Sequence, residues 1–102
     1  MTKSVFFGAL ATAGLLAGAA SAQTLAEVQE RDTLRCGVTT GLVGFAAPNE
    51  EGEWEGFDVA VCRAVAAAVL GDGSKVEFIP TTGSTRFTAL ASGEIDLLAR
   101  NT

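Results

Sequence analysis

Segments with the apolar pattern of strands alternate with segments that have the pattern of helices along most of the chain. Three strands and two helices are predicted in the order β-α-β-α-β, and helices of about 8 to 13 residues between short strands are typical of an α/β fold with a parallel sheet. The predicted strands are 34–38, 75–80 and 94–99, and the predicted helices are 58–70 and a segment between Ser84 and Gly93. The third strand is apolar over most of its length, which suits a strand covered on both faces of its sheet.

The helix over 58–70 has a signal at each end. Asp58 is expected to cap its start, because a carboxylate there can accept hydrogen bonds from the free N–H groups of the first turn. Phe57 is expected to pack back on the helix start. Gly71 is expected just past the helix end, where a left-handed backbone favours glycine.

The other helical segments are shorter. A helix is predicted over 25–30, ahead of the first strand. Ser84 or Thr85 is expected to cap the last helix, and Gly93 is expected to end it. The apolar stripe of that helix is expected to consist of Phe87, Leu90 and Ala91.

Residues 39–54 are predicted to form a loop with tight turns, because they contain three glycines and Pro48. A turn is expected over 49–52. The glycines do not form a phosphate-binding loop, since the Lys-Ser/Thr ending is absent and no helix follows directly. Paired acids for acid–base catalysis are conceivable in the acidic run, but a solvated hairpin tip is the favoured interpretation. The acids of this run are Glu50, Glu51, Glu53 and Glu55.

The first 22 residues are predicted to be a signal peptide. Lys3 precedes an uncharged, apolar run, which ends in the small-x-small sequence Ala20-Ser21-Ala22. The run is too short and too weakly apolar for a membrane span of about 20 residues, so a retained anchor is the disfavoured alternative. Cleavage is expected after Ala22, with export from the cytoplasm.

Charge and composition exclude several functions. Without the signal peptide, six basic and twelve acidic residues remain, a net charge of −6, which argues against a basic surface that binds nucleic acid or anionic lipid. The chain has no histidine and two cysteines, so a Ser-His triad and a Cys-His pair are excluded within it, and a structural zinc site has almost no ligands. No cofactor or metal is implied.

Cys36 and Cys62 have two interpretations. Export to an oxidising compartment favours a disulfide between them. Their spacing in the sequence does not reveal how far apart they lie in space, so two buried thiols remain equally open.

Small and polar residues follow all three predicted strands. Ligands of open α/β sheets bind beyond the carboxyl ends of the strands, and the segments there offer hydroxyls, backbone N–H groups and the guanidinium of Arg100. Such an edge suits an anionic or zwitterionic small molecule. The alternative is that these segments are ordinary connecting loops.

Three segments carry a resemblance to a known family: LRCGVTTGLVGF, GEWEGFDVAVCRAVAAAVLG and RFTALASGEIDLLARNT. Together they resemble the family-3 extracellular solute-binding proteins, the periplasmic receptors of polar amino-acid ABC transporters, and especially the general L-amino-acid subgroup. The resemblance implies a periplasmic-binding-protein-like (type II) receptor with two hinged lobes. Residues 23–102 would be the N-terminal part of the first lobe, incomplete at its C-terminus.

The resemblance also implies a function and partners. The full-length receptor would bind L-amino acids in the periplasm and deliver them to the membrane permease subunits of an ABC transporter. It would be monomeric, would not bind nucleic acid and would not be an enzyme.

By position, the resemblance places the pocket on three loops. Leu42 stands where several relatives place an aromatic residue on the ligand, and Gly83 stands where others carry a larger apolar group, which would fit a broad specificity. The family's carboxylate-binding arginine and the acid of the second lobe correspond to positions beyond Thr102. The implied substrate-binding residues are Thr39, Thr40, Leu42, Gly83, Arg100, Asn101 and Thr102.

Two alternatives stay open. The chain could be a truncated remnant that no longer binds a ligand. It could also belong to an enzyme, because some periplasmic dehydratases and cell-wall lyases share the scaffold. The loop residues offer no positioned acid or base, since an arginine such as Arg100 stays protonated.

Overall fold

The computed structural model describes residues 23–102. The predicted signal peptide and its cleavage site lie outside the described residues. Within residues 23–102, no helix has the length and apolar character needed to cross a membrane.

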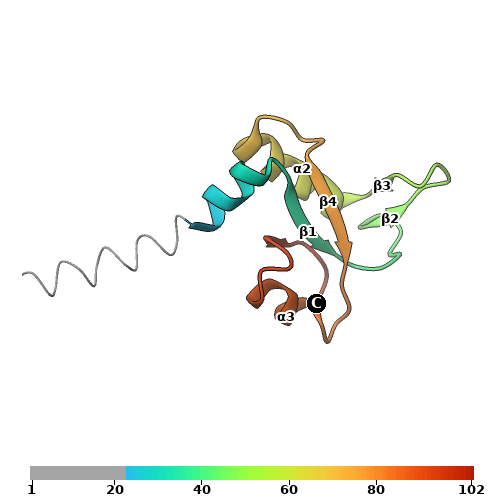
Figure 1. Cartoon of the computed structure of the whole chain (residues 1–102). Coiled ribbons are helices and arrows are strands. Elements are labelled where there is room, and N and C mark those ends of the chain that lie inside the picture. Colours follow the sequence, from blue (N-terminus) through green and yellow to red (C-terminus); the bar gives the residue numbers. More distant parts are fainter. Residues whose placement is uncertain (1–22) are drawn as a thin grey trace, which may run out of the picture.

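The described chain folds as an α/β unit with one three-stranded sheet and a small hairpin (Figure 1). Residues 23–31 are helical and lead into the sheet. The elements that follow are β1 (Leu34–Val38), β2 (Ala47–Pro48), β3 (Trp54–Glu55), α2 (Phe57–Leu70), β4 (Val76–Pro80), α3 (Arg86–Ala91) and β5 (Leu97–Leu98). The predicted order of strands and helices is confirmed, and the first predicted strand has the predicted bounds.

The sheet is parallel, with the strand order β4-β1-β5. In its register, Cys36 of β1 lies between Phe78 of β4 and Leu97 of β5. Only two residues of the predicted third strand form β5, because only Leu97 and Leu98 pair in register with β1. The predicted span of 94–99 was therefore too long.

Both faces of the sheet are covered, as successive residues of β1 demonstrate. Cys36 faces α2, where it is bonded to Cys62, and both residues are fully buried. A side chain at the next position, Gly37, would instead meet Ile95, Thr81 and Leu98. Because neighbouring residues of a strand point to opposite faces, α2 covers one face and the segment around Ile95 covers the other.

A disulfide joins β1 to α2. The Cα atoms of Cys36 and Cys62 lie 6.1 Å apart, and the structure has the disulfide rather than two thiols. Around it, the buried core includes Val38, Ala46 and Val59. A second buried cluster connects the helix at 23–31 to the sheet and α2, and it consists of Val28, Leu34 and Ala66.

The start of α2 differs from the prediction. The residue that caps it is Gly56, with φ 126°, and no side chain caps the helix. The predicted capping role of Asp58 is wrong, since Asp58 lies in the first turn and one of its carboxylate oxygens is buried without a hydrogen-bond partner among the described residues. Phe57 is 68% exposed rather than packed on the helix. The end of α2 is as predicted, because Gly71 has a left-handed backbone.

The cap and the apolar stripe of α3 also differ from the prediction. The Thr82 hydroxyl accepts from the Thr85 N–H at 3.1 Å, and the Thr85 hydroxyl accepts from the Thr82 N–H at 3.0 Å. Thr85 occupies the N-cap position, as predicted, but its side chain makes no capping hydrogen bond to the helix and pairs with Thr82 instead. The buried residue of α3 is Ala89, whose carbonyl accepts from the Ile95 N–H and so faces the chain leading to β5. The predicted stripe of Phe87, Leu90 and Ala91 is exposed.

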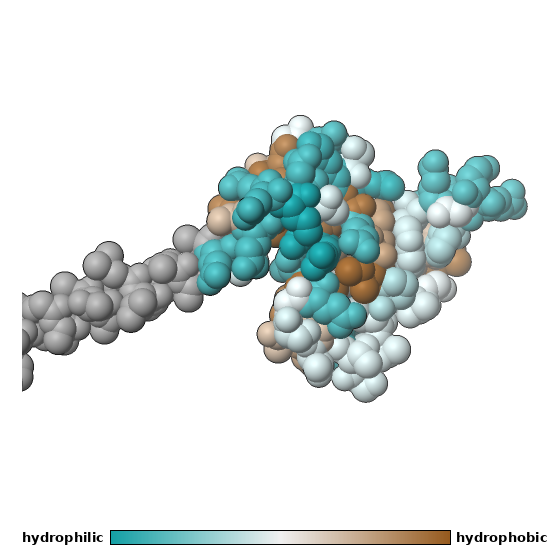
Figure 2. Space-filling view, viewed as in Figure 1, coloured by the Kyte–Doolittle hydropathy of each residue, from teal (hydrophilic) through white to brown (hydrophobic). Residues whose placement is uncertain are grey.

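The hairpin of β2 and β3 projects from the rest of the unit, and its tip is hydrophilic (Figures 1 and 2). The Asn49 side chain closes the tip by accepting from the N–H groups of Glu51 and Glu53 at 3.0 and 2.9 Å. The predicted turn and solvated acidic tip are confirmed. The prediction of a loop over 39–54 was incomplete, because this segment also contains β2 and the first residue of β3.

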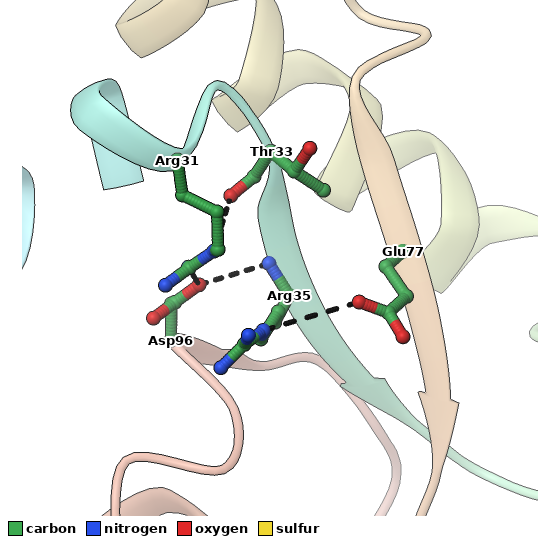
Figure 3. A network of polar contacts seen from close by, with 5 residues as sticks. All are labelled: Arg31, Thr33, Arg35, Glu77 and Asp96. Carbon is green, nitrogen blue, oxygen red and sulfur yellow. Dashed lines mark hydrogen bonds and ion pairs between the residues drawn. The ribbon is translucent and has the colours of Figure 1, made fainter. Parts of the chain in front are cut away.

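Asp96 connects the helix at 23–31, β1 and the segment before β5 (Figure 3). Its Oδ2 atom pairs with the Arg31 guanidinium and accepts from the Arg35 N–H at 2.9 Å. The Asp96 side chain is 9% exposed, so these bonds form largely away from water. In the same group, Glu77 approaches Arg35 only to 3.9 Å and is 60% exposed.

Replacing Asp96 with asparagine is expected to lower the free energy of unfolding by about 1.5–3 kcal/mol, because a charged hydrogen bond of a mostly buried group is lost. Urea denaturation would measure this change. The matched control is Glu77→Gln, for which a change within about 0.5 kcal/mol is expected because its ion pair is long and exposed. Equal effects of the two substitutions would contradict the role given to Asp96.

Candidate functional site

The carboxyl ends of the three sheet strands meet at one edge, because the strands are parallel. Val38 at the end of β1 lies opposite Pro80 at the end of β4. In Figure 1 the C-terminal end of the chain lies near the arrowheads of β1 and β4. We call this edge the rim, defined as residues 39–45, 81–86 and 99–102.

The Thr81 carbonyl is the centre of the rim. It accepts a hydrogen bond from the Thr40 hydroxyl at 3.4 Å and another from the Arg100 guanidinium. The Thr81 N–H and hydroxyl both donate to the Val38 carbonyl, at 2.8 and 3.1 Å. The Thr81 carbonyl therefore joins Thr40, which follows β1, to Arg100, which follows β5, and we call Thr40, Thr81 and Arg100 the Thr81 hub.

The structure brings some of the predicted site residues together. Thr40 and Arg100 meet at the Thr81 hub, and the buried Thr39 precedes Thr40. Asn101 joins this group, because the Arg100 Nε atom donates to its carbonyl at 3.2 Å. Thr102 follows and is exposed.

Leu42 and Gly83 lie further out on their loops. Leu42 exchanges two backbone hydrogen bonds with Ala46, at 3.1 and 2.9 Å, and its side chain is 38% exposed. A side chain added at Gly83 would meet nothing within 4 Å, so that loop leaves open space. No hydrogen bond among residues 23–102 connects either residue to the Thr81 hub.

Sequence reasoning missed two rim residues, Thr81 and Arg86. Thr81 is 4% exposed and acts through its backbone, which no residue pattern reveals. Arg86 lies at the start of α3, and its Nη1 atom donates to the carbonyls of Asn101 and Thr102 at 3.4 and 3.3 Å. The signal that could have found Arg86 is its charge, because a second cation stands at the start of a helix predicted to begin beside the rim.

The rim is positively charged on an acidic chain. It contains Arg86 and Arg100 and no aspartate or glutamate, whereas the whole chain has a net charge of −5. Hydroxyls, backbone N–H groups and guanidinium groups are hydrogen-bond donors, and together they can hold an anionic group. Among the described residues, no group of three or more His, Cys, Asp or Glu side chains could hold a metal ion.

Two surface hollows lie towards the amino ends of the strands, away from the rim. One of about 350 Å³ is lined by residues of the helix at 23–31 and by the chain from Leu90 to Asp96. The other, of about 280 Å³, is mainly apolar and lies between the same helix, Leu34 and α2. Neither includes a residue of the rim, so the candidate site rests on the hydrogen bonds of the rim.

Comparisons with known proteins agree with the fold and the motifs. Residues 34–102 match the model of a family described as bacterial extracellular solute-binding proteins, family 3. The chain belongs to this family. The expected resemblance is therefore confirmed over both helices and all strands of the sheet.

Relatives in this family are named as amino-acid-binding proteins. The chain is 64% identical, over 99% of its length, to the glutamate/glutamine/aspartate/asparagine-binding protein of Rhodobacter capsulatus. It is 53% identical, over its whole length, to the general L-amino acid-binding periplasmic protein of Rhizobium johnstonii. The chain spans 30% of the length of each of these relatives.

A solved structure confirms the architecture of this family-3 chain. An ABC transporter periplasmic binding protein from Brucella ovis, with glutathione bound, superposes with a TM-score of 0.75 and 59% identity. The match covers 78% of this chain and 25% of that one. The α/β fold with a parallel sheet, as part of a periplasmic-binding-protein lobe, is therefore shown.

Proposed function

We propose that residues 23–102 form the N-terminal part of the first lobe of a receptor that binds L-amino acids in the periplasm. The observation that carries the proposal is the Thr81 hub, where Thr40 and Arg100 converge on one carbonyl at the shared end of three parallel strands. Open α/β sheets bind ligands at this edge. The amino-acid ligands named for the two relatives support the same class of ligand.

Each candidate residue has a role in this proposal. Thr39 and Thr40 supply backbone donors, and the segment 100–102 supplies backbone N–H groups for the α-carboxylate of the ligand. Leu42 packs against the ligand side chain, and the open space at Gly83 admits side chains of different sizes. A zwitterionic ligand fits because donors dominate this lobe, while an acid of the second lobe would pair with its ammonium group.

The mechanism proposed is closure of two hinged lobes around the ligand, after which the closed receptor docks on permease subunits of an ABC transporter. The receptor is monomeric and reaches the periplasm by cleavage of residues 1–22 after Ala22. Membership of a family of extracellular proteins supports the export step.

We propose binding rather than catalysis. An enzyme at this edge would need an acid or base within reach of its substrate. The ionisable groups of the rim are Arg86 and Arg100, and a guanidinium supplies hydrogen-bond donors but no acceptor. Recovery of the purified longer receptor with an unchanged ligand after prolonged incubation would support this, whereas a converted ligand would contradict it.

Calorimetry on the longer receptor that contains this chain tests the binding proposal. L-glutamate, L-glutamine and L-alanine are the amino acids to titrate, with glutathione as a further ligand. We expect saturable binding of L-amino acids with one site per chain. If none of the amino acids gave a heat of binding, the result would contradict the proposal.

Replacing Arg100 with methionine is expected to weaken L-amino-acid binding about 10-fold or more, because a charged hydrogen bond to the Thr81 carbonyl is lost at the centre of the rim. The matched control is Arg63→Met on α2, since the Arg63 guanidinium donates to the Trp54 carbonyl, away from the rim. The control is expected to bind within about 2-fold of the wild type. Equal losses in the two variants would place the binding site elsewhere.

A further inference from the structure

We infer that Arg86 is a positioning residue for amino-acid binding. It holds the segment 100–102 in the orientation that presents the Thr102 N–H group to the ligand. The inference rests on the proposed function, because it assigns the donors of this segment to the α-carboxylate of the ligand. It gives a role to a residue that is not among the substrate-binding residues implied by the resemblance.

Arg86 makes a pair of contacts with the segment 100–102. A single guanidinium nitrogen, Nη1, donates to the Asn101 carbonyl at 3.4 Å and to the Thr102 carbonyl at 3.3 Å. A guanidinium is planar and holds its donors in a fixed fork. The Asn101 carbonyl is therefore turned towards α3 by a rigid group.

The geometry of the peptide bond fixes the direction of the Thr102 N–H group. In a trans peptide, the N–H group points away from the carbonyl of the same unit, and residues 23–102 contain no cis peptide bond. Because the Asn101 carbonyl points towards Arg86, the Thr102 N–H points away from it. Among the described residues this N–H group has no hydrogen-bond acceptor. It is consequently free to donate to an incoming carboxylate.

Arg86 is itself held in place by contacts with Thr82 and Phe87. Its backbone N–H donates to the Thr82 carbonyl at 3.1 Å, directly behind the reciprocal bonds between Thr82 and Thr85. Its guanidinium lies 4.7 Å from the centre of the Phe87 ring, a distance at which a cation and an aromatic face attract. This contact gives the exposed Phe87 ring a role. Arg86 thus connects the loop that contains Gly83 to the segment 100–102.

The first test compares affinities of variants of the longer receptor by calorimetry. L-glutamate, L-glutamine and L-alanine have the same α-ammonium and α-carboxylate groups and differ in their side chains. Arg86→Gln is expected to raise the Kd of all three by a similar factor of about 10 to 100, the range of a lost charged hydrogen bond. Arg86→Lys is expected to restore part of the affinity, because an ammonium group can reach one of the two carbonyls.

The control is Arg35→Gln, which makes the same change in charge at a residue whose side chain pairs weakly with Glu77. We expect an unchanged Kd for this variant, and melting temperatures of both ligand-free variants within about 2 °C of the wild type. A loss that is large for L-glutamate and small for L-glutamine would overturn the inference, because Arg86 would then contact the ligand side chain. An unchanged Kd in Arg86→Gln, or a large fall in its melting temperature, would also overturn it.

A second test does not depend on a ligand. The amide signals of Asn101 and Thr102 can be followed by NMR in the ligand-free receptor. Arg86→Gln is expected to shift or broaden these signals, and Arg35→Gln is expected to leave them in place. If the amides are unchanged in Arg86→Gln, the positioning role fails. If they change but no amino acid binds to the wild type, the positioning role stands and the proposed ligand class fails.

Discussion

Replacing Gly56 with alanine is expected to lower the free energy of unfolding by at least about 3 kcal/mol, a loss typical of forced backbone movement. Gly56 has φ 126°, and a Cβ atom there would overlap the carbonyl group of Phe45. The overlap involves backbone atoms, which cannot move away as a flexible side chain could. The glycine directly before Phe57 and Asp58 is thus explained by a close approach between two backbone segments.

The close approach at Gly56 also supports the first pocket loop. The Phe57 N–H donates to the Gly44 carbonyl at 2.9 Å, and the Asp58 N–H donates to the Phe45 carbonyl at 3.0 Å. The free donors at the start of α2 are therefore satisfied by the loop that contains Leu42. Displacement of this loop in Gly56→Ala would weaken ligand binding as well as stability.

Urea denaturation of the longer receptor measures this effect, and Gly52→Ala is its matched control. Gly52 also has a positive φ, 81°, but a side chain there would meet nothing within 4 Å. The control isolates the cost of the backbone conformation, about 1 kcal/mol. Equal destabilisation of the two variants would show that the contact with Phe45 has no special role.

Removing the disulfide is expected to have the second large effect. A Cys36→Ala, Cys62→Ala double variant should lose about 3–4 kcal/mol of stability, because the bond closes a loop with a sequence separation of 26 residues and thereby restricts the unfolded chain. Both residues are fully buried in the core between β1 and α2, so the variant also loses packing there. The sheet and its main covering helix would then be held by packing alone.

Thermal unfolding of the variant and of the wild type with and without reductant separates these contributions. The reduced wild type keeps both sulfur atoms and lacks only the cross-link, so its stability is expected to lie between the other two. Thiol titration of the unfolded wild type should find no free cysteine. Two free thiols per chain, with no effect of reductant on unfolding, would contradict the disulfide.

Much of the fold could be predicted because its signals are local. The strand Leu34–Val38, the glycine after α2 and the turn at Asn49 all depend on residues close together in the sequence. The prediction for Asp58 failed because the start of α2 is set by Phe45, a residue in another loop. The short β5 has a similar cause, since an apolar run becomes a strand only where it pairs with a neighbour.

The candidate site was harder to predict than the fold. Parallel strand ends are expected to meet, so Thr40 and Arg100 could be placed at the same edge before the structure was known. Thr81 joins them through its carbonyl, and every residue except proline carries the same backbone groups, so the sequence contains no sign of this role. Arg86 was missed because its acceptors lie on a segment 15 and 16 residues away in the sequence.

A crystal structure of the longer receptor with L-glutamine bound would show whether the ligand lies at the rim. We expect the α-carboxylate of the ligand to lie within hydrogen-bond distance, about 2.7–3.2 Å, of donors from Thr40 and from the segment 100–102. We also expect that Arg86 still contacts the carbonyls of Asn101 and Thr102 behind the ligand. A ligand bound away from the rim, with these donors exposed to solvent, would contradict the proposal.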